Sequence, residues 1–131
     1  MEEPDLRKVL EETKTIAVIG MREQGAAGYV PMYMKDAGYE ITPVNPGLDA
    51  VFGIPALDTL DDLDQPVDMV NIFRRSEDVP GHLEEILRAK PKYAWMQLGI
   101  ANEAVAQKLR EAGIGVVQNR CLMVEHGRLM R

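Results

Sequence analysis

The chain is poor in the residues that form disulfides and zinc sites. It has 131 residues but a single cysteine, Cys121, and two histidines, His82 and His126. One cysteine excludes a disulfide within the chain and is typical of a protein from a reducing compartment. Neither histidine has metal-ligand spacing from Cys121, so we predict no metal site.

The chain also lacks long apolar runs and an excess of positive charge. No run approaches the roughly 20 apolar residues that span a bilayer, and the acidic start, Met1–Pro4, has no apolar signal-peptide segment. The formal net charge is −6, whereas nucleic acids and anionic membranes are bound by basic faces. We therefore expect a cytoplasmic protein whose partners are neither nucleic acid nor membrane.

Motifs for catalysis are missing as well. The sequence contains no nucleophile elbow, P-loop, paired-carboxylate site or Ser/His/Asp arrangement. We therefore predict no catalytic residue, and a binding function in preference to an enzymatic one.

What the sequence does contain is an alternation of apolar runs and amphipathic segments. The runs predict strands at Thr15–Ile19, Ile41–Val44, Val67–Phe73, Tyr93–Leu98 and Gly115–Val117. Periodic apolar residues between them predict helices, one ending at Gly38, one capped by Ser76 and one capped by Asn102. The stretch from Asn45 to Pro66 is typical of a loop, in which we expect one turn of helix around Leu57–Leu60.

This alternation indicates an α/β fold. We expect a Rossmann-like three-layer sandwich, with a five-stranded parallel sheet and helices on both faces. We expect the strand order 3-2-1-4-5, although the flavodoxin-like order 2-1-3-4-5 fits the same pattern. Residues 1–131 are expected to form a single domain. Either order gathers the loops after the strands at one edge of the sheet, where α/β proteins bind ligands.

Arginines and glycines follow the predicted strands at these carboxyl ends. Gly20-Met21-Arg22 follows the first strand, Phe73-Arg74-Arg75 the third and Asn119-Arg120 the fifth. Cations gathered there in an acidic chain predict an anion site, with the phosphate of a cofactor as the anion. The alternative is that Arg74 and Arg75 form only surface ion pairs with nearby carboxylates such as Glu77.

The first of these loops leads into a helix. Gly20 ends the strand, and Gly25 and Gly28 flank the helix start, whose N–H groups and dipole favour a phosphate. The spacing departs from the G-x-G-x-x-G dinucleotide motif, so a turn that merely permits close packing is the alternative. Tyr29 in the first helical turn either stacks on a base or packs against the sheet.

The residue after the second strand argues against NAD. A nicotinamide-binding Rossmann domain places Asp or Glu there to bond the ribose hydroxyls, whereas this chain has Val44-Asn45-Pro46-Gly47. Neutral Asn45 does not repel a phosphorylated ribose, and Arg22 is placed to reach one from the first loop. NADP and coenzyme A both fit this pattern.

Five segments, taken together, resemble a known family. Ile16–Gly20, Pro43–Pro46, Phe73–Arg75, Gln97–Gly99 and Asn119–Cys121 occur in the order and at the intervals of the stand-alone CoA-binding domain proteins of bacteria and archaea. These proteins are similar to the N-terminal domain of the succinyl-CoA synthetase alpha subunit. The resemblance extends over nearly the whole chain, and it implies a Rossmann-type fold that binds coenzyme A at the strand ends.

The resemblance also implies which residues contact the cofactor. The first loop would approach its phosphates, the second its adenine and the third the rest of the molecule, while the fourth and fifth would form the floor and far side. The residues so implied are Gly20, Met21 and Arg22; Val44, Asn45 and Pro46; Phe73 and Arg74; Gln97 and Gly99; and Asn119 and Arg120. With Gly28, Tyr29 and Arg75, they make up the predicted binding site.

Two positions depart from the family pattern. Arg22 stands where a small hydroxyl residue is common, and Gly47-Leu48 stands where a lysine often follows the Asn-Pro pair. The first change adds positive charge near the phosphates, and the second removes some.

The resemblance implies a function but leaves alternatives. Synthetases of this type need further domains, so we expect a module that holds coenzyme A or an acyl-CoA rather than a ligase. The alternatives are an NADP-dependent oxidoreductase and a thiol-dependent acyl-CoA enzyme that uses Cys121. Association into a homo-oligomer or a larger synthetase-like assembly also stays open.

Overall fold

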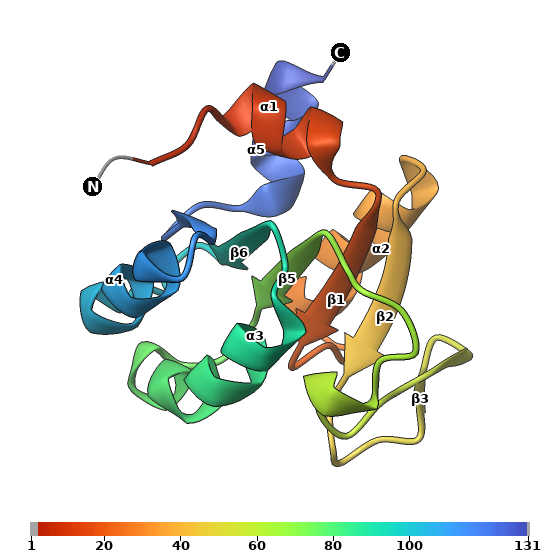
Figure 1. The fold of residues 1–131 in the computed structure, drawn as a ribbon. Coiled ribbons are helices and arrows are strands. Elements are labelled where there is room, and N and C mark those ends of the chain that lie inside the picture. Colours follow the sequence, from red (N-terminus) through yellow and green to blue (C-terminus); the bar gives the residue numbers. More distant parts are fainter. Residues whose placement is uncertain (1–2, 131) are drawn as a thin grey trace.

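The computed structural model describes residues 3–130 and shows a parallel β-sheet between two layers of helices (Figure 1). The strands of this five-stranded sheet are β1 (Thr15–Ile19), β2 (Glu40–Val44), β5 (Met69–Ile72), β6 (Tyr93–Met96) and β7 (Gly115–Val117). All neighbouring pairs in the sheet run parallel. The predicted α/β, Rossmann-like fold is confirmed.

The side chains of β1 divide between two hydrophobic cores. One face of the sheet is covered by α1 (Leu6–Glu12), α2 (Ala26–Asp36) and α5 (Leu122–Leu129), and the other by α3 (Leu83–Ala89) and α4 (Glu103–Glu111). Ile16 and Val18 pack into the first core, whereas Ala17 and Ile19 pack into the second. Successive side chains of a strand point to opposite faces, so this one strand supports both layers.

The strand order corrects the expected topology. The sheet has the order β2-β1-β5-β6-β7, which is 2-1-3-4-5 when its strands are numbered along the chain. The expected order 3-2-1-4-5 is therefore wrong, and the flavodoxin-like alternative is correct. Pro43 has no N–H to donate to a second neighbour, which suits β2 to the edge, where it pairs with β1. All four residues of β5 are buried, as suits a strand with a neighbour on each side.

Two predicted helix caps have different outcomes. Asn102 caps α4 as expected, because its Oδ1 accepts a hydrogen bond from the N–H of Val105 (3.0 Å). Ser76 is instead the first residue of a 3-10 helix, η2 (Ser76–His82), and α3 begins only at Leu83. Pro80 has no N–H to donate to the Ser76 carbonyl, and that oxygen accepts from Nδ2 of Asn102 (3.3 Å).

The sequence does not predict the hairpin after β2. The stretch expected to be loop contains an antiparallel hairpin of β3 (Ala50–Val51) and β4 (Ile54–Pro55). Each of these strands is only two residues long, which is too short for a periodic pattern. The helical turn expected around Leu57–Leu60 lies slightly later, as the 3-10 turn η1 (Leu60–Asp62).

Helix α5 is also not predicted, because Gly127 lies inside it and lowers its helix propensity. The helix is held to α2 by tertiary contacts instead. Nδ1 of His126 lies 3.0 Å from the hydroxyl of Tyr33, and its ring packs edge-on against Tyr33 and Tyr39. Burial lowers the pKa of His126, which favours the neutral ring in this contact.

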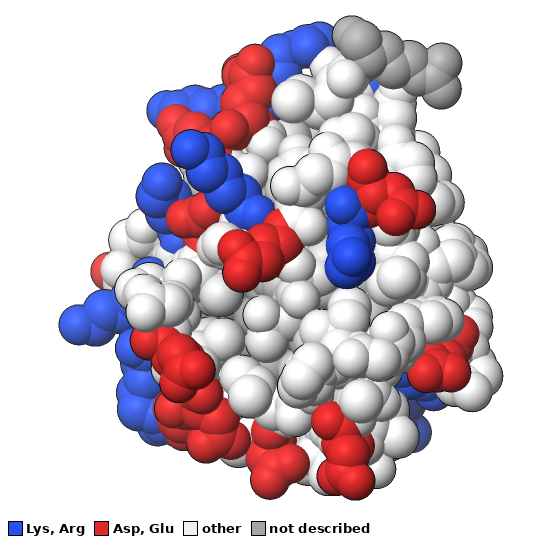
Figure 2. Space-filling model, turned by 90° about the vertical axis from the view of Figure 1, so that its right-hand side faces the viewer, with Lys and Arg blue, Asp and Glu red and all other residues white. Residues whose placement is uncertain are grey.

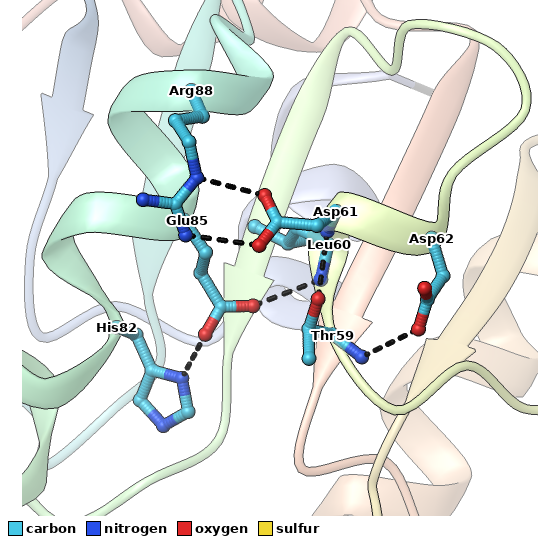
Figure 3. A network of polar contacts seen from close by, with 7 residues as sticks. All are labelled: Thr59, Leu60, Asp61, Asp62, His82, Glu85 and Arg88. Carbon is cyan, nitrogen blue, oxygen red and sulfur yellow. Dashed lines mark hydrogen bonds and ion pairs between the residues drawn. The ribbon is translucent and has the colours of Figure 1, made fainter.

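A polar network fastens η1 to α3 (Figure 3). Oε1 of Glu85 accepts a hydrogen bond from the N–H of Leu60 (2.9 Å), and Oε2 lies 2.9 Å from Nδ1 of His82. Beside them, Arg88 makes two contacts of 2.9 Å with the carboxylate of Asp61, and this hydrogen bonding lowers the pKa of Asp61. The network fixes the chain that returns from the edge strand β2 to the central strand β5.

Candidate functional site

The loops after β1, β2 and β5 meet at the carboxyl end of the sheet. Gly20, directly after β1, donates its N–H to the carbonyl of Val44 (2.8 Å) and has a φ of +84°. A Cβ at Gly20 would lie 2.2 Å from the carbonyl oxygen of Phe73. Glycine therefore allows both the left-handed backbone and the close approach of the first and third loops.

This approach brings Arg22 and Arg74 to the same crevice. Nη1 of Arg74 lies over Gly20, 3.1 Å from where a Cβ would stand. Within residues 3–130, neither guanidinium has an ion-pair partner. The crevice therefore has positive charge that no described carboxylate neutralises.

The start of α2 borders the same crevice. Its N-cap is Gly25, which supplies no side-chain hydrogen bond to the first-turn N–H groups, and Ala26 and Ala27 line the crevice. The N–H groups and the helix dipole favour a negative group at this end. Gly28 has a packing role, since a Cβ there would lie 2.6 Å from the carbonyl oxygen of Arg22.

Asn45 ties the second loop to the first. Its Nδ2 donates to the carbonyl of Met21 (3.1 Å), and its Oδ1 accepts from the N–H of Gly47 (3.1 Å). The side chain of Met21 is fully buried beneath this contact. Asn45 thus positions the backbone of the first loop, and it places no negative charge beside Arg22.

The fourth and fifth loops are joined by side chains of the predicted site. The fourth strand ends at Met96, so Gln97 begins the loop rather than continuing the strand. Gln97 is buried, and its Oε1 accepts from the N–H of Leu122 (3.3 Å). Oδ1 of Asn119 accepts from the N–H of Gly99 (2.7 Å). These contacts set the shape of the loop that runs from Gln97 to Ile100.

Together the loops enclose a crevice of about 580 Å³. The predicted residues that line it are Gly20, Arg22, Asn45, Phe73, Arg74, Arg75 and Gly99. Sequence reasoning missed Ala26, Ala27, Asp78, Leu98 and Ile100. For Leu98 there was a signal, because it ends a predicted strand at the carboxyl edge, where α/β sheets bind ligands.

The other predicted residues do not line this crevice. Met21, Val44 and Gln97 are buried beneath the loops, while the side chain of Tyr29 is exposed. The other predicted residues outside the lining of the crevice are Gly28, Pro46, Asn119 and Arg120. Their direct contact with a ligand stays a prediction.

Two of the predicted arginines are neutralised by carboxylates. Arg75 lies 2.9 Å from Asp78 and 3.4 Å from Glu77, and hydrogen bonding to Asp78 raises the pKa of Arg75. Arg120 lies 2.9 Å from Glu3, and that hydrogen bond raises the pKa of Arg120. The alternative of surface ion pairs therefore holds for Arg75 but not for Arg74.

Two other parts of the surface are less suited to an anion. Figure 2 shows charges of both signs on one face, with acidic side chains gathered along its lower part. A more enclosed cavity of about 320 Å³ lies at the opposite, amino end of β1 and β2, and its lining includes Glu40, Asp62 and Asp64. Carboxylates repel phosphate, so the crevice at the carboxyl end is the candidate site.

The described part of the chain offers neither a metal site nor a membrane span. Among residues 3–130, no group of three His, Cys, Asp or Glu side chains is placed to hold a metal ion. No helix in that range is long and apolar enough to cross a bilayer. Cys121, the thiol of the enzymatic alternative, is partly buried and is not among the residues that line the crevice.

Comparison with known proteins identifies the family. The sequence pattern of the CoA binding domain matches residues 14–127, which is well over half of the chain. The chain belongs to the CoA-binding domain family. The resemblance inferred from five short segments is therefore confirmed.

Relatives of this CoA-binding domain protein include both short and long chains. The uncharacterized protein YneT of Bacillus subtilis is 41% identical over 124 residues, which cover 93% of this chain and 92% of YneT. A solved structure from Thermus thermophilus has 43% identity and a TM-score of 0.91, covering 98% of this chain and 99% of its own. An ADP-forming acetate–CoA ligase of Methanocaldococcus jannaschii is 34% identical over 80 residues, but these are only 11% of the ligase.

Proposed function

We propose that this protein binds coenzyme A, or an acyl-CoA, in the crevice at the carboxyl ends of β1, β2, β5 and β6. The observation that carries the proposal is that Arg22 and Arg74 line one crevice beside the start of α2, in a member of the CoA-binding domain family. Both guanidinium groups lack an ion-pair partner among the described residues. Arginine suits phosphate because its fork of N–H donors matches two oxygens at once.

The charges in the crevice suggest which groups of the protein hold the pyrophosphate and which hold the ribose phosphate of coenzyme A. The pyrophosphate fits the first turn of α2, where Gly25 supplies no side-chain cap for the N–H groups of Ala26 and Ala27. Arg22 would then hold the ribose phosphate, because Asn45 beside it is neutral and its amide already bonds to Met21 and Gly47. NADP also carries a ribose phosphate, so it is the competitor that the test must include.

We propose that the protein binds its ligand without transforming it, and that it acts in the cytoplasm. Among the described residues that line the crevice, the only carboxylate is Asp78, and it is paired with Arg75. A general acid or base needs a titrating group within reach of the substrate. We therefore expect acyl-CoA to be recovered unchanged after incubation with the protein, which mass spectrometry of the nucleotide would check.

The test is calorimetric titration of the full chain with coenzyme A, dephospho-coenzyme A and NADP. We expect Arg22→Ala to weaken coenzyme A about tenfold or more, because a charge-assisted hydrogen bond is worth roughly 1.5–3 kcal/mol. Dephospho-coenzyme A, which lacks the ribose phosphate, should be weakened less. Arg74→Ala should weaken both ligands to similar extents.

The matched control is Arg88→Ala. Arg88 is an exposed arginine paired with Asp61, and it does not line the crevice. It should leave the affinity for coenzyme A unchanged. Tighter binding of NADP than of coenzyme A, or unchanged affinity in both crevice variants, would contradict the proposal.

A further inference from the structure

We infer that the end of the crevice lined by Leu98 and Ile100 holds an aliphatic acyl group, so that the preferred ligand is an aliphatic acyl thioester of coenzyme A. The inference rests on the proposed binding of coenzyme A in the same crevice. It adds the chemical class of the acyl group, which the family does not specify.

Leu98 is an apolar residue held out in solvent. The residue is 66% exposed, more than any other large apolar residue among residues 3–130. Ile100 donates its N–H to the carbonyl of Gln97 (2.8 Å), and Gly99 between them has a φ of +86°. This is the pattern of a type II turn, in which the residue before the glycine stands at the corner.

The turn is fixed by its neighbours rather than loose. The N–H of Gly99 donates to Oδ1 of Asn119 (2.7 Å), and the N–H of Asn119 donates to the carbonyl of Ile100 (3.0 Å). The side chain of Gln97 is anchored below by the N–H of Leu122. The exposure of Leu98 is therefore set by the fold, and burying it would require a ligand or partner at this wall.

The wall continues into the rest of the crevice. Phe73 and Ile100 line the crevice together with Leu98. Phe73 packs against the core beneath α1, α2 and α5, and Ile100 packs against the core beneath α3 and α4. A single exposed leucine is ordinary, but an apolar wall inside a crevice is typical of a ligand site.

The apolar wall and the cationic groups lie at different places along the sheet edge. Arg22 follows β1, whereas Leu98 follows β6, and β5 lies between these strands. Neighbouring strands are roughly 4.8 Å apart, so the two loops are separated by roughly 10 Å. The pantetheine arm of coenzyme A is longer than this separation, so a ligand whose phosphates lie at Arg22 can reach Leu98 with its other end when the arm is bent along the strand ends. In an acyl-CoA, that other end carries the acyl group.

The charges near this wall disfavour an acyl group with a second carboxylate. Arg74 is assigned to the phosphates in the proposed function, and Arg75 is already paired with Asp78 and Glu77, so the group formed by Arg75 and these two carboxylates is net negative. It adjoins the wall, because the Ser76 hydroxyl oxygen accepts from the N–H of Ala101 (3.0 Å). A terminal carboxylate here would meet repulsion, whereas a methyl or methylene group would cover Leu98.

The test compares the affinities of the full chain for coenzyme A, butyryl-CoA and succinyl-CoA by calorimetry. We expect butyryl-CoA to bind about tenfold tighter than coenzyme A, the effect of removing roughly two methylene groups from water. Succinyl-CoA should gain no such advantage. In Leu98→Ser the ratio between the affinities for butyryl-CoA and coenzyme A should fall to about twofold or less.

Val124→Ser is the matched control, since Val124 is an exposed apolar residue that does not line the crevice. It should keep the tenfold ratio. Equal affinities for butyryl-CoA and coenzyme A in the unaltered protein, or the full ratio in Leu98→Ser, would overturn the inference while leaving coenzyme A binding intact. Succinyl-CoA bound as tightly as butyryl-CoA would overturn the aliphatic class. Failure of every thioester and of coenzyme A to bind would instead contradict the proposed function, and the inference with it.

Discussion

Gly20 shows how much a single residue contributes to this site. It accepts a left-handed backbone, lies beneath the guanidinium of Arg74 and leaves room for the carbonyl of Phe73. Its N–H also bonds to Val44 of the neighbouring strand. One position thus joins three strand ends, and a side chain there would push them apart.

We therefore predict that Gly20→Ala destabilises the protein. The left-handed conformation alone costs a non-glycine residue roughly 1–3 kcal/mol, and the clash with Phe73 adds to it. Gly113→Ala is the control, because Gly113 has a similar φ of +87° but no atom within 4 Å of its added Cβ. Chemical denaturation should show a larger loss for Gly20→Ala, and equal losses would contradict the role of the close approach.

The sequence predicted the positions of the site residues better than their partners. Arg22 and Arg74 lie in the crevice because they follow strands, and that placement is local. Arg75 pairs with Glu77 and Asp78, which are local partners that the sequence offers. Nothing local distinguishes Arg22 and Arg74 from Arg120, which the fold pairs with a distant carboxylate. The partner of Arg120 is Glu3, 117 positions away along the chain.

At the level of elements, the polar network between η1 and α3 adds to the packing of Leu60, which is buried in the same core as Leu83 and Ile86 of α3. Glu85 on α3 has two acceptor oxygens, one for the backbone of Leu60 and one for His82. Its side chain is only 14% exposed. The carboxylate is thus committed to holding the segment that leads into β5.

We predict that Glu85→Ala destabilises the protein by about 1–3 kcal/mol, since the N–H of the buried residue Leu60 loses its acceptor. Glu85→Gln should recover most of the loss because its amide oxygen can still accept that bond. Arg88→Ala should change the free energy of unfolding little, as the pair with Asp61 is exposed. Equal effects of the alanine and glutamine variants in urea denaturation would argue against this hydrogen bond.

The elements predicted from sequence are those with enough residues to show a period. The stop of α2 near Gly38, the cap of α4 at Asn102 and the strands of the sheet follow from local patterns. The hairpin after β2 is too short for a pattern. Helix α5 depends on docking to α2 through His126 and Tyr33, which no local pattern contains.

At the scale of the whole molecule, both cores share one sheet. The helices on its two faces pack on alternate residues of the same strands. We therefore propose, as first expected, that residues 1–131 form a single domain.

A single domain should unfold in one cooperative transition. Trp95, the only tryptophan, is fully buried in the core beneath α1, α2 and α5, so its fluorescence reports on that side. Far-UV circular dichroism reports on the helices of both faces. The two signals should give the same midpoint in urea, and separate midpoints would indicate that the two layers unfold independently.

The α/β class, the strands and the loops that carry the arginines follow from local sequence, because hydrophobic period and turn residues act over a few positions. Which of these loops are neighbours depends on the strand order of the folded chain. In the order 3-2-1-4-5, Arg22 and Arg74 would follow strands separated by another strand, whereas in the observed order β1 and β5 are adjacent. Strand order depends on which surfaces each strand buries and on crossovers between distant residues. That choice placed two unpaired arginines, distant in sequence, at one crevice.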